Sequence, residues 1–167
     1  MKTKAVIHML GVATFFAAVV VMLVQAQEVV GADGHTETKV SEIRQNGKYV
    51  RTTEVFRDKV LVSQKREISA HDNGKIDFIS EKLFSSGEMV FASSCYPGKR
   101  TIRSYYYQGK MVLEECDLDG DGFFKTVIVF DAKEQPVEAF ERNKDGTVTQ
   151  FSEEEFAKLK KTFALTE

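Results

Sequence analysis

Short turn-forming segments recur along most of this chain at a spacing of roughly 11 to 14 residues, the length of one strand and one tight turn. Most of them contain Gly, Asn, Asp or Ser, residues that tolerate the backbone of a tight turn. They are Asn46-Gly47, Asp58-Lys59, Asp72-Asn73-Gly74, Ser86-Gly87, Pro97-Gly98, Gln108-Gly109, residues 117–122, residues 131–136 and Asp145-Gly146. The spacing predicts a mainly all-β chain folded as a single antiparallel β-meander.

The segments between the turns have the composition of strands. Residues 49–56, 60–68, 101–107 and 123–130 are rich in β-branched and aromatic side chains. Charges also occur inside these segments, as in Lys65-Arg66-Glu67, so at least one face of the sheet must be wet. No consensus repeats beyond the turn residues, which argues against a solenoid. We therefore expect one curved sheet or a partly closed barrel.

The C-terminal segment has a helical pattern in place of the strand pattern. Ser152 and Glu155 form a capping box, and Phe151 can pack on Phe156 as a hydrophobic staple. Phe156, Leu159 and Phe163 then fall on one stripe, with acidic residues first and lysines after them. The pattern predicts a helix over 152–164 whose apolar stripe packs on the sheet. An exposed helix offered to a partner is the alternative.

The N-terminal segment is typical of a secretory signal peptide. Met1-Lys2-Thr3-Lys4 is basic, an uncharged and mostly apolar run follows from Ala5 to Val24, and Val24-Gln25-Ala26 suits signal peptidase. We expect residues 1–26 to be removed, which leaves one exported domain over 27–167 in the periplasm or outside the cell. The alternative is that the run stays as an N-terminal membrane anchor, because it is about long enough to span ~30 Å of lipid.

Charge and motif content exclude several classes of function. The formal net charge is −2, and the loss of Lys2 and Lys4 with the signal peptide makes it −4, which argues against nucleic-acid binding. The mature chain keeps only His35 and His71, and it contains none of the common hydrolase, metalloprotease or phosphate-loop motifs. We therefore expect no enzyme activity. The expected partner is a protein or another envelope component, with membrane contact only if the N-terminal segment is retained.

One motif has a specific chemistry, residues 117–122 with the sequence Asp-Leu-Asp-Gly-Asp-Gly. Alternate carboxylates with glycine at the sharp turn can converge on a hard cation, which takes six to eight oxygen ligands. The segment resembles the first half of the calcium loops of EF-hands and dockerins over these six residues, and no whole-chain family resemblance accompanies it. The resemblance implies calcium ligation by the carboxylates of Asp117, Asp119 and Asp121 and by the backbone carbonyl of Phe123.

The loop departs from the EF-hand pattern at its twelfth position, where Ile128 stands in place of the bidentate Glu. A further ligand would have to come from elsewhere, with Glu114, Glu115 and Asp131 as candidates, and the affinity would be weak, at ~10⁻⁴ to 10⁻³ M. The alternative is that Asp and Gly only form the hairpin turn. Residues 143–149 resemble a calcium loop more weakly, and an Asp-Gly turn ahead of the helix cap explains the same residues.

Cys95 and Cys116 are the two cysteines, and an even pair in an oxidising compartment suggests a disulfide. If residues 100–107 pair with 110–116 about the Gln108-Gly109 turn, however, Cys116 lies opposite Thr101, and Cys95 flanks that central strand on its other side. Strands two apart are separated by ~9.5 Å, beyond the ~7 Å reach of a disulfide between Cα atoms. The bond therefore requires a curled strand end or a different register, and both possibilities stay open.

The expected function follows from these features. We expect an exported, non-catalytic β-domain that acts as a binding or structural module and is steadied by calcium. The first alternative is a carrier that holds an apolar, lipid-like ligand in a curved sheet. Tyr105 and Tyr107 share a face of their strand and could contact a ligand, although packing within the sheet also explains them. A small hydrolase using a pair such as Glu114 and Asp131 is the third possibility.

Overall fold

The computed structural model describes residues 23–30, 34–71 and 74–164, and these form one antiparallel sheet of eleven strands with one helix. The strands follow one another across the sheet in chain order, so the predicted β-meander is confirmed. The elements are β1 (Leu23–Val30), β2 (Thr36–Gln45), β3 (Lys48–Arg57), β4 (Val60–Ser69), β5 (Phe78–Ser85), β6 (Glu88–Tyr96), β7 (Arg100–Tyr107), β8 (Lys110–Asp117), β9 (Thr126–Phe130), β10 (Pro136–Arg142), β11 (Val148–Gln150) and α1 (Glu153–Ala164).

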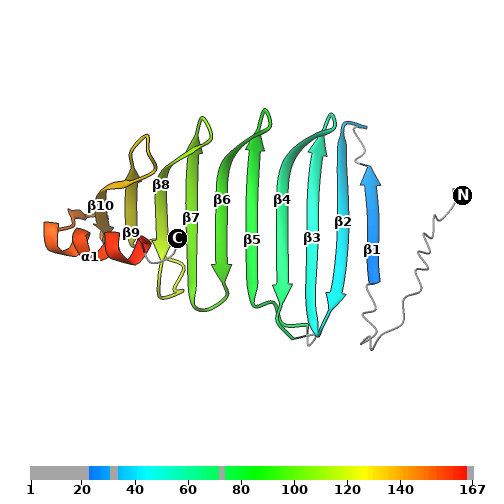
Figure 1. Ribbon diagram of the computed structural model, residues 1–167, viewed down its shortest axis with the longest axis horizontal. Coiled ribbons are helices and arrows are strands. Elements are labelled where there is room, and N and C mark those ends of the chain that lie inside the picture. The colour runs from blue at the N-terminus through cyan, green and yellow to red at the C-terminus, as the bar shows by residue number, and fades with distance from the viewer. Residues whose placement is uncertain (1–22, 31–33, 72–73, 165–167) are drawn as a thin grey trace, which may run out of the picture.

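The sheet is open. Among the described strands, β1 bonds only to β2 and β11 only to β10, so the two ends of the sheet do not meet and no barrel closes. Figure 1 shows the strands in one row, with α1 running across them at the β8–β10 end. No other described element lies over β2–β7, so this part of the molecule is a single layer.

Most of the predicted signal peptide lies outside the described residues. The described part of the chain begins with β1 at Leu23, so this strand includes residues on both sides of the expected cleavage point after Ala26. Cleavage there would remove the first half of the strand that pairs with Ser41–Arg44 of β2. Among the helices that the structure describes, none has the length and apolar character needed to span a membrane.

The register divides the sheet into two unlike faces. Residues that lie opposite each other in an antiparallel ladder share a face, and neighbours along a strand alternate. We call the face that carries Cys116, Ile128 and Ala139 the helix face, because α1 packs on it, and the other the opposite face. The helix therefore covers one side of one end of the sheet.

The buried apolar cluster lies under α1. Cys116, Ile128, Phe130 and Ala139 are at most 7% exposed, and Phe156 and Leu159 of the helix pack against them. Among the described side chains of β2–β7, by contrast, only Ser69 is buried.

The helix begins where the sequence predicts, because Ser152 and Glu155 form the reciprocal bonds of the capping box. Ser152 N–H donates to Glu155 Oε2 at 2.9 Å, and Glu155 N–H donates to Ser152 Oγ at 3.4 Å. The predicted docked helix is thus confirmed.

Three hairpins repeat a pattern that the sequence analysis missed. The β3–β4, β5–β6 and β7–β8 hairpins each have a two-residue turn, then a pair of residues across the strands, then an aromatic residue opposite Leu or Met. A β-bulge follows at a valine of the second strand. The aromatic pairs are Phe56–Leu61, Phe84–Met89 and Tyr106–Met111, and the bulged residues are Val62, Val90 and Val112.

The turns of these hairpins have positive φ at both central residues, the conformation that matches the twist of paired strands. Ser86-Gly87 and Gln108-Gly109 place glycine at the second position, where no Cβ is strained. The β3–β4 turn instead places Lys59 there, with φ of 68°. An L-residue with a side chain is disfavoured in this region by about 1–2 kcal/mol.

Lys59→Gly should therefore stabilise the protein. Part of the gain is offset because glycine is more flexible in the unfolded chain, so we expect a net increase of about 0.5–1 kcal/mol in the free energy of unfolding. Urea titration at pH 7 measures it, and Gly109→Lys, at the equivalent position of the β7–β8 turn, is the matched control that should lose stability. A decrease on Lys59→Gly would show that the lysine side chain contributes more than its backbone strain costs.

Candidate metal loop

The Asp-rich segment forms the connection between β8 and β9, and Asp117 organises it. Asp117 is the last residue of β8 and is 2% exposed. Its two carboxylate oxygens accept the backbone N–H groups of Gly120 at 2.8 Å and Gly122 at 2.9 Å. Because both bonds run from one carboxylate to the far side of the turn, they hold the loop in its compact shape. The carboxylate of Asp117 thus braces the turn through the backbone of its two glycines.

The other two carboxylates bond locally. Asp119 Oδ1 accepts the N–H of Asp121 at 3.4 Å, and Asp121 Oδ1 accepts the N–H of Phe123 at 2.8 Å, both two residues ahead as in Asx-turns. Phe123 thus contributes its amide to the loop. These bonds use one lone pair of each oxygen and leave others available to a cation.

Gly120 fits the loop against the turn between β6 and β7. It has φ of +74°, and a Cβ at this position would lie 2.8 Å from the backbone nitrogen of Lys99. No larger residue fits without moving one of the two backbones, so glycine is required here by close approach as well as by conformation. The Asp loop is consequently braced on the neighbouring hairpin and not only on its own bonds.

The three aspartates lie close enough together to hold one ion. One oxygen of each of Asp117, Asp119 and Asp121 can be chosen so that all three lie within 4.8 Å of one another. Calcium needs six to eight oxygens, so three or more would have to come from backbone carbonyls or water. Among the described residues the cluster contains these three carboxylates and no fourth one.

The additional carboxylates considered from the sequence have other partners. Glu114 lies on the helix face and accepts a bond from Ser104 Oγ at 3.3 Å, whereas Glu115 lies on the opposite face and pairs with Arg142 at 3.1 Å. Asp131 lies in the β9–β10 turn, where its carboxylate accepts the N–H groups of Lys133 and Gln135. Within the described part of the chain, none of these three carboxylates joins the cluster of the loop.

Lys144 supplies a positive charge that sequence reasoning missed. Its Nζ lies 2.7 Å from Asp121 Oδ2. Lys144 belongs to the turn between β10 and β11, directly before Asp145-Gly146. The bond from Lys144 and the backbone N–H of Phe123 lower the pKa of Asp121, and the same pairing raises the pKa of Lys144. The lysine thus partly neutralises the loop where a metal ion otherwise would.

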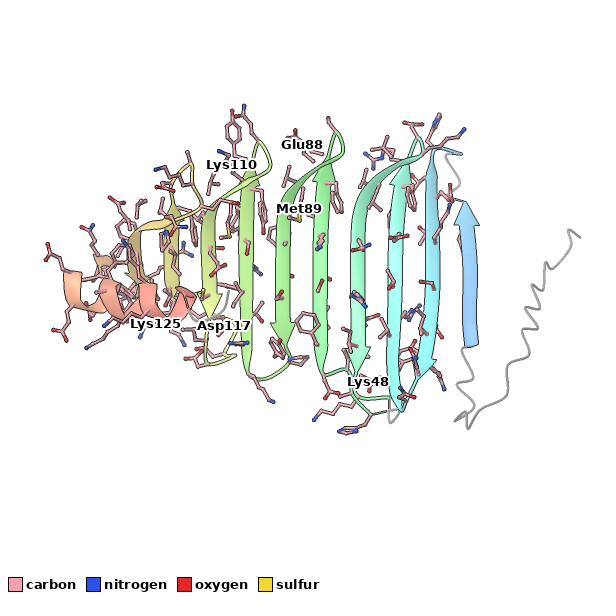
Figure 2. All side chains as sticks on the ribbon, in the orientation of Figure 1. Lys48, Glu88, Met89, Lys110, Asp117 and Lys125 are labelled. Atoms are coloured by element: carbon pink, nitrogen blue, oxygen red, sulfur yellow. The ribbon has the colours of Figure 1, made fainter. Side chains whose placement is uncertain are left out.

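A hollow of about 350 Å³ lies beside the loop. Its lining combines charged residues with apolar ones from the edge of the core, namely Cys116, Leu118, Asp119, Lys125, Thr126, Glu141 and Phe151. Lys125 and Glu141 form an ion pair at 2.5 Å, and Glu141, with a smaller effect from Asp119, raises the pKa of Lys125. Figure 2 labels Asp117 and Lys125 at this end of the sheet, near α1.

The two cysteines are free thiols in the structure. Cys95 lies opposite Thr101 and Cys116 opposite Ile102, so they flank β7 on separate strands and point to different faces of the sheet. The sequence alone placed Cys116 opposite Thr101, and the bulge at Val112 shifts it by one residue. This geometry argues against the candidate disulfide. Burial raises the pKa of Cys116 to about 12, so its thiol stays protonated and unreactive.

Tyr105 and Tyr107, the candidate ligand contacts, share the opposite face, and Tyr106 lies on the helix face. The Tyr105 hydroxyl donates to Glu115 Oε2 at 2.8 Å, and its ring meets the edge of Phe91 at a centroid distance of 5.4 Å. Tyr107 is 67% exposed at the end of β7. Tyr105 is thus used in packing within the sheet, and Tyr107 is the accessible ring of the two.

Glu114 is a carboxylate buried next to the core, a feature that the sequence pattern did not reveal. It is 7% exposed, lies opposite Ile128 in the ladder, and bonds to Ser104 and to the thiol of Cys116. Burial raises its pKa, and the two bonds lower it by less. Neither of these two partners is a cation, so the hydrogen bonds to this carboxylate come from neutral donors.

Comparisons of the chain with protein-family models, with curated proteins and with solved structures find no match.

Glu114→Gln should stabilise the protein at neutral pH. A carboxyl group whose pKa is raised by folding contributes stability that is present below its unfolded pKa, near 4, and is lost as the pH rises through the folded value. The variant should therefore match the wild type near pH 4 and exceed it by about 1 kcal/mol or more at pH 7. Urea unfolding across this pH range measures the difference.

Glu115→Gln is the matched control, because the neighbouring Glu115 lies on the other face and pairs with Arg142 and Tyr105. It should lose stability at pH 7. Equal pH dependence of the wild type and Glu114→Gln would mean that Glu114 is not the buried acid described here.

Proposed function

We propose that this chain is an exported, non-catalytic module whose sheet is a binding or structural element outside the cytoplasm. The observation that carries the proposal is the unequal use of the sheet. One face of β8–β10 packs against α1. In β2–β7, by contrast, both faces of a single layer are accessible, and only Ser69 is buried among their described side chains. A sheet of this extent with two accessible faces is suited to contact with another macromolecule.

The same packing argues against the carrier alternative. A carrier needs an apolar cavity beneath the helix, but Phe156 and Leu159 pack directly on the buried cluster around Ile128 and Phe130. The hollow beside the Asp loop has an ion pair in its lining, which a lipid-like ligand would leave desolvated. Native mass spectrometry of the purified chain distinguishes the two, because a carrier should retain a bound lipid and a module should not.

Site-specific photo-crosslinking in the native host tests the module directly. A photoreactive amino acid would replace Met89 on the helix face, Leu83 on the opposite face, or exposed Lys133 in the β9–β10 turn as the control. The proposal predicts a discrete cross-linked protein from at least one face and none from Lys133. The absence of an adduct from both faces, in cells that contain the exported chain, would contradict it.

Calcium is the second part of the proposal. The support is the cluster of Asp117, Asp119 and Asp121 within 4.8 Å, in a loop whose backbone is already held in a turn. We propose that calcium binds this cluster weakly and displaces Lys144 from Asp121. The extracellular setting provides millimolar calcium, the range in which loops with few ligands are occupied.

Calcium should raise the melting temperature of the protein, because an ion that binds only the native state stabilises it. For a dissociation constant of ~1 mM, 10 mM calcium adds about 1.4 kcal/mol, or about 3–5 °C. Differential scanning calorimetry in chelator and then in calcium, with magnesium as the ion control, measures the shift. Asp119→Ala with Asp121→Ala should abolish it.

Lys144→Met provides a sharper form of this test. Removal of the ammonium group releases Asp121 Oδ2 for the ion and removes a competing positive charge, so the calcium-dependent shift should increase. A shift that is absent in every variant would show that the segment is only a turn. A shift that persists without Asp119 and Asp121 would place the ion elsewhere.

A further inference from the structure

We propose that the helix face of β3–β7 is the docking surface for an acidic amphipathic helix of a partner protein. The inference rests on the proposed function and deepens it, because it names the face that binds and the chemistry of the partner. Its support comes from three features: the repeated apolar pairs, the spacing of apolar rows and the charge of this face.

The apolar pairs of the repeated hairpins form a row that ends at the cluster on which α1 packs. On the helix face, Phe130 belongs to the buried cluster under α1, and Met111 packs against that cluster. The row continues away from the helix through Tyr106, Met89, Phe84, Leu61 and Phe56, at equivalent positions of the successive hairpins. Their side chains are only half-buried, and no described element covers them. α1 itself crosses β8–β10 nearer the Asp117 end of β8 than the Lys110 end, so it lies beside this row and not on it (Figure 2).

A second apolar row runs parallel to the first near the other ends of the strands. Ile43, Val50, Ile68 and Phe78 lie opposite one another on the helix face, and the ring of Phe78 meets Tyr96 at 4.9 Å. Phe84 and Phe78 mark the two rows on β5, so the rows are about 20 Å apart at ~3.3 Å per residue. Between them, β5–β7 carry the small side chains of Ser80, Ala92, Ser94 and Ser104, together with Lys82 and Ile102.

The apolar side chains of the two rows fill part of the distance between them. The remaining width is close to the diameter of a helix with its side chains, about 10–12 Å. A helix lying in the band would cross the strands, as α1 does at the β8–β10 end (Figure 1). It would meet small residues beneath it and apolar residues on both sides. Figure 2 places Met89, of the first row, near the turn end of β6.

The charge of the face specifies the partner. On β2–β7 the helix face carries five basic residues, Lys39, Lys48, Arg66, Lys82 and Arg100, against two acidic ones, Glu37 and Glu54. Within the described part of the chain, the exposed side chains of Arg66 and Lys82 form no ion pair, and both lie within the band, Arg66 opposite Ser80 and Lys82 opposite Ala92. Lys39 pairs with Glu37 on this face. The opposite face of β2–β7 is closer to neutral, with five basic residues against four acidic ones, and there Arg51 pairs with Glu42 and Lys65 with Glu67. An acidic helix therefore complements the helix face better than the opposite face.

A synthetic helix tests the inference with the full chain. The probe is a fluorescein-labelled peptide of residues 151–164 in which Lys158, Lys160 and Lys161 are replaced by glutamate, so that its apolar stripe is kept and its charge becomes acidic. A peptide of the same composition with the apolar stripe scrambled is its control. Fluorescence anisotropy at low and at physiological salt should show saturable binding of the first peptide, and binding of the scrambled peptide at least tenfold weaker.

Charge reversal on the two faces provides the matched variants. Arg66→Glu with Lys82→Glu should weaken peptide binding at least tenfold, whereas Arg51→Glu with Arg57→Glu, the same charge change at exposed positions of the opposite face, should change it less than twofold. Circular dichroism establishes that both variants keep the sheet. Absence of saturable binding, or equal loss in both variants, would overturn the inference.

Two further outcomes would assign the face to another occupant and also overturn it. One is binding of the chain to phosphatidylglycerol vesicles that depends on Arg66 and Lys82 while the peptide does not compete. The other is self-association in sedimentation velocity that is lost in the Arg66→Glu, Lys82→Glu variant. A protein adduct from Leu83 on the opposite face, with no peptide binding to the helix face, would reject this inference and leave the proposed function standing.

Discussion

The hydrogen-bonded ladder between consecutive strands is the interaction on which the rest of this structure depends. Every described strand pairs only with its neighbours in the chain, and β2–β7 have no second layer to hold them together. Register must therefore be set locally, by two-residue turns with left-handed backbone and by bulges at fixed positions after the turns. The β8–β9 connection is longer than these turns. There the Asp117 carboxylate fixes the path of the chain locally, through its two bonds to backbone N–H groups.

Side-chain contacts across the strands replace a core over most of the sheet. Phe91 meets Tyr105 edge to face, Lys39 lies over the ring of Phe56, and Arg44 over that of Tyr49. Contacts of this kind contribute a fraction of a kcal/mol to about 1 kcal/mol each, less than burial under α1 provides at the other end. The two ends of the sheet consequently differ in character: one is a small packed core, and the other is a surface. This difference is the physical basis for assigning the binding role to β2–β7.

The fold was predictable from the sequence because its determinants are local. Turn residues such as Asn46-Gly47 and the capping box of Ser152 and Glu155 act within a few residues, so the meander and the helix follow from them. The bulge at Val112 was not predictable, and it displaced the expected partner of Cys116 by one residue, which turned the two cysteines to different faces. Lys144 and the burial of Glu114 were missed because both depend on segments that are distant in the sequence. The repeated aromatic pairs were hidden because only their positions relative to the turns are constant.

The position of the buried cluster indicates that stability is concentrated at the β8–β10 end, whereas β3–β6 are held as a single layer by the ladder. Amide hydrogen exchange of the monomeric chain, followed by mass spectrometry with peptide-level resolution, measures this difference. We expect the slowest exchange in β8, β9 and β10 under α1, and faster, graded exchange through β7 toward β3. Exchange in β3–β6 that is as slow as in β8–β10, or slower, would contradict this expectation. It would mean that β3–β6 are protected by more than the ladder of a single layer with two accessible faces.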